Sequence, residues 1–227
     1  MELSCREAFA LSYLNVFEKF NVNVAPKYLE INRRLFHDIL LMSAYTRQTK
    51  EESGGFVIRG KHGHIGVVAV QIGKDREINL YPSETLYSGE EYLGTYHAHP
   101  VTNTFSIADV ATFLYDRNEK ISLNSGDDNS INATIKTPQT IQISKEDISF
   151  LEKNFKQEDI AKLANIYHFL YYKGKSNSRI LELQNDGMTT TEKEMFDDFV
   201  RNIRGLPRIP RTWVKKKPKV HQYLFSE

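Results

Sequence analysis

Cysteine, surplus charge and long apolar runs are all scarce in this sequence, and each scarcity argues against a class of protein. Cys5 is the single cysteine among 227 residues, so no disulfide can form within the chain and a reducing compartment is expected. Lys and Arg number 30 against 29 Asp and Glu, a net charge of +1 that favours neither a nucleic-acid nor a membrane partner. No stretch approaches the roughly 18 apolar residues that span a bilayer. We therefore expect a soluble cytoplasmic protein.

What the chain does contain is an alternation of helical and strand patterns. Apolar residues at helical spacing predict helices at 5–20, 28–47, 106–118, 145–172 and 189–204. Short β-branched runs predict strands at 54–60, 63–73 and 91–99, with further strand character in 77–90 and 124–147. This order predicts an α/β fold with a mixed sheet flanked by helices. We expect three regions: an N-terminal helix (1–25), a central domain (26–145), and a helical C-terminal extension with a basic tail (146–227).

The stretch GTYHAHPVTNTFSIADVATF, residues 94–113, gathers metal-binding side chains where a strand leads into a helix. His97 and His99 are two residues apart on an extended segment, so their side chains point to the same side. Ser106 is of a preferred N-cap type, and Asp109 falls in the first turn of the following helix. Two imidazoles and one carboxylate suit Zn²⁺ at a catalytic site, where a fourth position stays open to water. We therefore predict a Zn²⁺ site at His97, His99 and Asp109.

Hydrolysis at such a site also requires a base that accepts a proton from water. Glu51 and Glu52 come just before Gly54 and Gly55, where a predicted helix gives way to a strand. The glycines allow a sharp turn and a close approach of the backbone. From the local pattern alone, either glutamate can be the base. A serine close to the ion, Ser106, can donate a hydrogen bond to an oxyanion.

Taken together, Glu-Ser-Gly-Gly at 52–55, His-Ala-His-Pro at 97–100 and Ser-Ile-Ala-Asp at 106–109 resemble the motifs of the JAMM (JAB/MPN) zinc metalloproteases. The resemblance covers roughly residues 26–145 and is closer to uncharacterised bacterial branches than to the eukaryotic deubiquitinases. It implies a JAB/MPN fold with a cytidine-deaminase-like layout, and hydrolysis of peptide or isopeptide bonds beside ubiquitin-like modifiers. It further implies a general base (Glu52), an oxyanion donor (Ser106) and three zinc ligands (His97, His99 and Asp109).

Two positions differ from the usual family pattern. The step from His99 to Asp109 is one residue shorter than is usual, and Phe105 precedes the serine where many members have proline. A shorter loop can still close, because Asp109 needs only to reach the metal from the first helical turn. The differences therefore bear on substrate specificity.

The resemblance implies a protein or peptide substrate, such as a ubiquitin-like modifier or its conjugate, and no nucleic-acid or membrane partner. Oligomerisation through the C-terminal extension is a further expectation. Two other functions stay open: a non-catalytic scaffold of the same fold, and an amidohydrolase barrel, for which the chain offers too few strand–helix units. A second His-x-His pair, His62 and His64, has no carboxylate at useful spacing and is interpreted as exposed.

Overall fold

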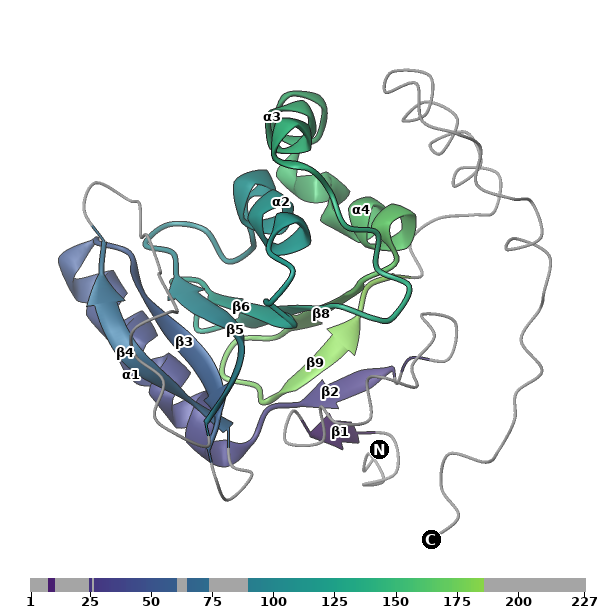
Figure 1. Ribbon diagram of the computed structural model, residues 1–227. Coiled ribbons are helices and arrows are strands. Elements are labelled where there is room, and N and C mark those ends of the chain that lie inside the picture. Colours follow the sequence, from purple (N-terminus) through teal and green to yellow (C-terminus); the bar gives the residue numbers. More distant parts are fainter. Residues whose placement is uncertain (1–7, 11–24, 26, 61–64, 74–89, 186–227) are drawn as a thin grey trace, which may run out of the picture.

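The computed structural model describes residues 8–10, 25, 27–60, 65–73 and 90–185. Over these residues the chain forms one nine-stranded sheet with helices on both faces (Figure 1). The strand order is β1-β2-β9-β8-β7-β6-β5-β3-β4. The β1–β2 and β5–β6 pairs are parallel, and the other neighbours are antiparallel. The predicted class, an α/β fold with a mixed sheet flanked by helices, is confirmed.

Each element is short, as is usual for a compact α/β unit. The strands are β1 (Ala8–Ala10), β2 (Tyr28–Glu30), β3 (Ser53–Arg59), β4 (Ile65–Ile72), β5 (Glu91–Ala98), β6 (Ile121–Ser125), β7 (Ile131–Ile135), β8 (Leu170–Gly174) and β9 (Ile180–Leu183). The helices are α1 (Arg33–Thr49), α2 (Ile107–Tyr115), α3 (Lys145–Asn154), α4 (Ile160–Tyr167) and the 3₁₀ helix η4 (Gln157–Asp159). None of the described helices is long and apolar enough to cross a bilayer.

The helix predicted at 28–47 begins later than expected. Residues 28–30 form β2, which pairs with β9, and α1 starts after Asn32. The Asn32 side chain accepts a hydrogen bond from Leu35 N at 2.9 Å and thereby caps the helix. The helix ends at Lys50, which adopts a left-handed conformation with φ 63°. Local periodicity extended the prediction backwards because the strand's partner lies about 150 residues further along the chain.

The helical prediction at 145–172 is wrong at its end. The chain forms α3, η4 and α4 over most of this range, but α4 stops at His168, which has φ 57°. Residues 170–174 then form β8 against β7, and 180–183 form β9 between β8 and β2. The region expected to be a helical extension from residue 146 therefore supplies two interior strands of the sheet.

At the N-terminus, the prediction of a helix at 5–20 is wrong for Ala8–Ala10, which pair in parallel with β2. The rest of that range lies outside the described residues, and so do residues 77–89 and the helix predicted at 189–204. Three residues are too few to show a period, and their strand conformation comes from pairing with β2.

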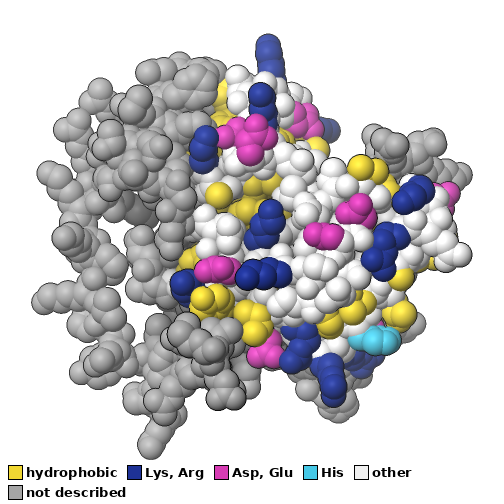
Figure 2. Space-filling view, turned by 180° about the vertical axis from the view of Figure 1, so that it is seen from behind, with side chains coloured by type: hydrophobic (Ala, Val, Ile, Leu, Met, Phe, Trp, Pro, Cys, Tyr) yellow, Lys and Arg dark blue, Asp and Glu magenta, His cyan; other side chains and the backbone are white. Residues whose placement is uncertain are grey.

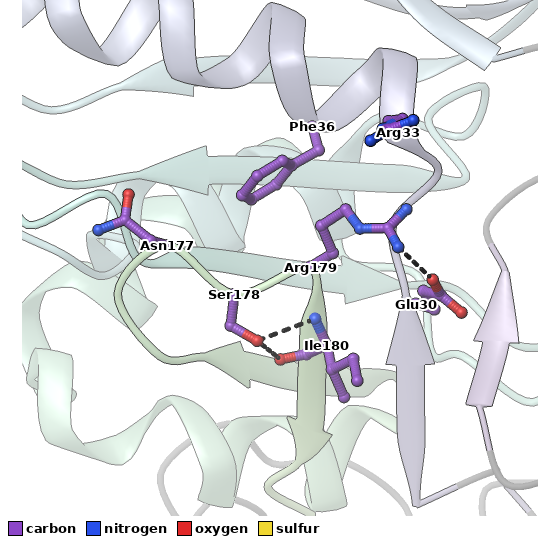
Figure 3. A pocket seen from close by; sticks show the side chains of 7 residues that line it. All are labelled: Glu30, Arg33, Phe36, Asn177, Ser178, Arg179 and Ile180. Carbon is purple, nitrogen blue, oxygen red and sulfur yellow. Dashed lines mark hydrogen bonds and ion pairs between the residues drawn. The ribbon is translucent and has the colours of Figure 1, made fainter. Parts of the chain in front are cut away.

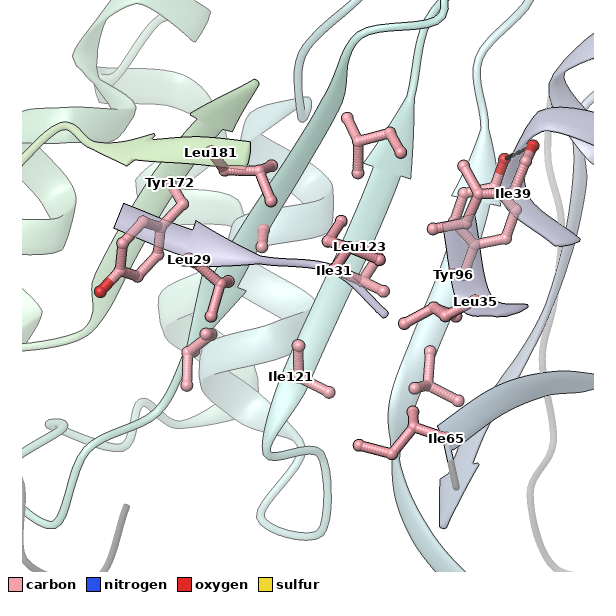
Figure 4. Close-up of a cluster of buried hydrophobic side chains, with 14 of the residues drawn as sticks. Leu29, Ile31, Leu35, Ile39, Ile65, Tyr96, Ile121, Leu123, Tyr172 and Leu181 are labelled. Atoms are coloured by element: carbon pink, nitrogen blue, oxygen red, sulfur yellow. Dashed lines mark hydrogen bonds between the residues drawn. The ribbon is translucent and has the colours of Figure 1, made fainter. Parts of the chain in front are cut away.

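Two hydrophobic cores lie on opposite faces of the sheet. The first is closed by α1, whose Leu35, Ile39 and Met42 pack against side chains of the strands (Figure 4). The second lies beneath α2, α3 and α4 and is built around Phe105 and Phe169. The site-bearing strand β5 runs between these two cores.

Alternation along β5 decides which of its side chains enters which core. Tyr96 and Ala98 belong to the core under α1. Successive side chains of a strand point to opposite faces, so His97 lies on the α2 face, where its ring meets Phe105. The strand therefore presents the histidine to the helix that carries Asp109.

The surface carries charges of both signs. On the face shown in Figure 2, acidic and basic side chains are interspersed. Glu91 at the start of β5 pairs with Arg59 of β3 at 2.9 Å and with Lys120, just before β6, at 2.6 Å. Such exposed pairs contribute at most about 1 kcal/mol each. They link the three strands at the end opposite to His97.

Candidate metal centre

His97 and His99 lie at the end of β5, and both side chains are largely buried at 7% exposure. Their ring centroids are 4.7 Å apart. The fully buried ring of Phe105 meets His97 edge to face at 6.1 Å. Because the strand and this apolar contact fix both rings, their Nε2 atoms are held close to a common point.

Asp109 reaches that point from the start of α2. Ser106 caps the helix: its Oγ accepts a hydrogen bond from Asp109 N at 3.1 Å. In return, Asp109 Oδ2 accepts one from Ser106 N at 2.7 Å, which completes a capping box. The same Oδ2 lies 3.4 Å from His97 Nε2 and 3.4 Å from His99 Nε2. The cap therefore aims the carboxylate at the histidines.

The ligand atoms of His97, His99 and Asp109 lie within 4.8 Å of one another, so this group can hold one metal ion. His97 Nε2 is buried without a hydrogen-bond partner, and such an atom usually has an ion or a water to satisfy it. The side chain of Asp109 is 23% exposed, which leaves the cluster open to solvent on that side.

The electrostatics of the cluster suit a cation. Burial raises the pKa of Asp109, but the two histidines outweigh burial and hold that pKa well below its ordinary range. Burial lowers the pKa of His97, yet the carboxylate of Asp109, aided by Glu52 and Glu119, raises it overall. The cluster thus contains a carboxylate that stays ionised.

The strand register distinguishes between the two candidate glutamates. In the β3–β5 pair, Gly54 lies opposite His97 and Ser53 opposite Ala98. Continuing this register by one residue places Glu52 opposite His99, and directly opposed residues share a face of the sheet. Glu52 also raises the pKa of His97 through its charge. Glu52 is half-buried whereas Glu51 is exposed, so geometry favours Glu52.

The inner side of His99 is held by polar groups that the sequence interpretation missed. Its Nδ1 lies 3.0 Å from the Thr104 carbonyl oxygen, 3.0 Å from Thr102 Oγ1 and 3.1 Å from Asn124 Nδ2. Asn124 Oδ1 accepts from Asn132 Nδ2 at 2.9 Å across β6 and β7. Both asparagines are fully buried. Asparagine is unusual in strands, and its presence within ISLNS and INATI was the available signal.

A buried carboxyl group, Glu119, lies further along the same face. It accepts hydrogen bonds from the backbone N–H of Thr95, at 3.1 Å, and from the Thr95 hydroxyl. Burial raises the pKa of Glu119 to about 7, and hydrogen bonding to Thr95 and the charge of Lys136 lower it in part. Thr95 is two residues before His97, so Glu119 supports the strand that carries the ligand.

A separate pocket of about 560 Å³ lies between the start of α1 and the turn from β8 to β9 (Figure 3). Its lining includes Glu30, Arg33, Phe36 and Arg179. Arg179 is paired with Glu30 at 2.9 Å, so the pocket contains its own counter-ion. Phe36 packs against the core under α1, and no residue of the histidine cluster lines this pocket.

The structure therefore brings His97, His99, Ser106 and Asp109 into one cluster and places Glu52 on the same face of the sheet. Comparison of the sequence with protein-family models, and with curated proteins, finds no match. The geometry and the motifs of the chain thus carry the functional interpretation.

Proposed function

We propose that this chain is a zinc-dependent hydrolase of peptide or isopeptide bonds of the JAMM type. The observation that carries the proposal is the convergence of His97, His99 and Asp109 on one point, with Glu52 on the same face. Two imidazoles and one carboxylate form a three-ligand set with room for water and substrate. An α1-covered face and an α2-covered face around a mixed sheet support a JAB/MPN, cytidine-deaminase-like layout.

Each residue then has a distinct task. When bound, Zn²⁺ supplies Lewis acidity that lowers the pKa of a coordinated water and polarises a substrate carbonyl. Glu52 accepts the proton that the attacking water loses and delivers it to the leaving amine. Ser106 Oγ already accepts a hydrogen bond from Asp109 N, which leaves its own hydroxyl hydrogen free to stabilise an oxyanion.

The substrate class follows from the open side of the cluster. An extended chain end, such as the tail of a ubiquitin-like modifier or its conjugate, can approach along the exposed side of Asp109. Val101, which is 63% exposed and follows the His-x-His-Pro motif, offers an apolar contact for such a chain. Cytoplasmic location is part of this proposal because it rests on the single cysteine.

The first test is the metal content of the purified protein. Wild type should contain stoichiometric zinc by elemental analysis. His97→Ala should lose the metal because one of three ligands is gone. Glu52→Gln should keep it, since Glu52 is assigned to proton transfer and not to ligation. A wild-type protein without zinc, also after reconstitution, would contradict the proposal and favour the scaffold function.

The second test is hydrolysis. Unstructured peptides and a lysine-linked ubiquitin conjugate are incubated with zinc-loaded protein, and products are identified by mass spectrometry. Glu52→Gln should lower the rate by about 10²–10⁴-fold, the usual contribution of a general base. Full activity in zinc-loaded Glu52→Gln would contradict the assignment of Glu52.

A further inference from the structure

The loop between the second histidine and the helix, residues 100–105, sets the distance between His99 and Asp109. Three side chains from distant elements hold it. Asn132 Nδ2 on β7 donates to the Asn103 carbonyl. Tyr171 OH on β8 lies 3.1 Å from Thr104 Oγ1. The third, Gln157, begins η4, in the segment beyond residue 145 that the motifs do not cover.

Gln157 makes the most direct connection to the metal cluster. Its Nε2 donates to the Thr104 carbonyl at 3.2 Å and to the Phe105 carbonyl at 3.1 Å. These two carbonyls come immediately before Ser106, the residue that caps α2. One amide group therefore holds the backbone at the junction between the loop and the helix that carries Asp109.

The Thr104 carbonyl is also a partner of His99. It lies 3.0 Å from His99 Nδ1, and a carbonyl oxygen can only accept a hydrogen bond. It therefore favours the tautomer with the proton on Nδ1, in which Nε2 keeps its lone pair for a metal. His99 Nε2 is the atom that faces Asp109 at 3.4 Å. The position of one carbonyl thus decides whether His99 is ready to ligate.

We propose that Gln157 is a positioning residue of the metal centre. By holding the Thr104 and Phe105 carbonyls, it fixes the tautomer and ring orientation of His99 and the start of α2 at once. The proposal rests on the metal site of the proposed function and extends it to the segment after residue 145. In a loop one residue shorter than is usual for the motif, this outside support sets the His99–Asp109 distance.

The structure contains a matched control on the same helix. Gln142 Nε2 donates to the carbonyls of Leu114 and Tyr115, at the other end of α2. Gln142→Met and Gln157→Met each remove two amide–carbonyl hydrogen bonds and leave a side chain of similar length. The two variants differ in whether the lost bonds touch the metal loop.

The experiment measures zinc affinity of the full chain by competition with a chromophoric chelator. Gln157→Met should bind zinc about 10–100-fold more weakly than wild type, the usual cost of losing an outer-shell partner. Gln142→Met should bind zinc as wild type does. Gln157→Glu keeps the length and removes the N–H donors, so it should weaken binding as well. It also gives an independent measurement if Gln157→Met does not fold.

A second measurement separates positioning from general stability. In zinc-loaded wild type, the Nδ1–H signal of His99 in ¹⁵N NMR should be protected from exchange with water. The protection should fall in Gln157→Glu and persist in Gln142→Met, even if urea unfolds both metal-free variants equally early.

The possible outcomes discriminate between the two proposals. If wild type binds zinc and both Gln157 variants bind it equally well, the role of Gln157 is contradicted and the hydrolase proposal stands. Equal weakening by Gln142→Met would also contradict it. If wild type binds no zinc, both proposals fail.

Discussion

At the scale of residues, Asp109 and Ser106 hold the start of α2 by exchanging two hydrogen bonds, and Asp109 also faces both histidines. The capping geometry and the metal geometry are compatible because they use the same orientation of the carboxylate. Helix capping alone explains the capping box. It leaves unexplained why two buried imidazoles point at the carboxylate.

Glu119 supports a prediction about pH at the same scale. Its pKa in the folded protein is about 7, above the ordinary 4.5, mainly because of burial. Between these values the folded state binds more protons than the unfolded state, so stability falls as pH rises. Glu119→Gln should remove this part of the slope. Its amide oxygen can still accept the hydrogen bonds from Thr95.

The measurement is the free energy of unfolding in urea, taken across that pH range for wild type and variant. Glu158→Gln is the control because it removes the same charge from an exposed position. Other charges act on Glu119, chiefly Lys136, Asp116 and His97, and they remain in both proteins. An unchanged slope in Glu119→Gln would contradict the prediction.

At the scale of elements, the turn between β6 and β7 packs against the metal loop. A Cβ atom placed on Gly126 would lie 2.2 Å from Asn103 Cα and 2.7 Å from the Thr102 carbonyl oxygen. Both contacts are to backbone, so the loop itself has to move if the turn gains a side chain. The loop is therefore confined on this side by the turn and on the other sides by Asn132, Gln157 and Tyr171.

Gly126→Ala should consequently displace the loop. We expect a loss of about 1–3 kcal/mol in the free energy of unfolding, as for other overpacked sites, together with weaker zinc binding. Gly66→Ala in β4 is the control, because its nearest neighbour, Asp38 Oδ2, lies at an ordinary 3.4 Å. Urea unfolding and chelator competition measure the two effects. Wild-type zinc affinity in a destabilised Gly126→Ala would show that the loop moves without disturbing the ligands.

At the scale of the whole molecule, the last two described strands join the beginning of the chain to the site. β9 pairs with β2, and β8 pairs with β7, so residues 170–183 lie between the N-terminal strands and the strands next to β5. Leu170, Tyr172 and Leu181 contribute to the core under α1. Phe169 and Tyr171 contribute to the core under α2.

A chain that ends after residue 145, the boundary suggested by the motifs, should therefore fail to fold. It would lose buried side chains from both cores and leave β7 as an unpaired edge. We expect no cooperative unfolding transition in urea by circular dichroism, whereas the full chain should show one. A sharp transition in the shortened chain would contradict this expectation.

The sequence by itself determined the ligand set of the candidate site. His97 and His99 lie on one face because a strand alternates with a period of two, and Asp109 lies near them because Ser106 begins a helix. These relations extend over a few residues, so local spacing reveals them. For the same reason α2, β3, β4 and β5 lie where the patterns predict them.

Only the tertiary structure decided the rest. The choice of Glu52 over Glu51 depends on the register of β3 against β5. The strands β2, β8 and β9 depend on pairing between segments about 150 residues apart. Gln157 reaches the loop from more than 50 residues away. The free energy of such contacts comes from burial and hydrogen bonding between distant segments, and no short window of sequence contains both partners.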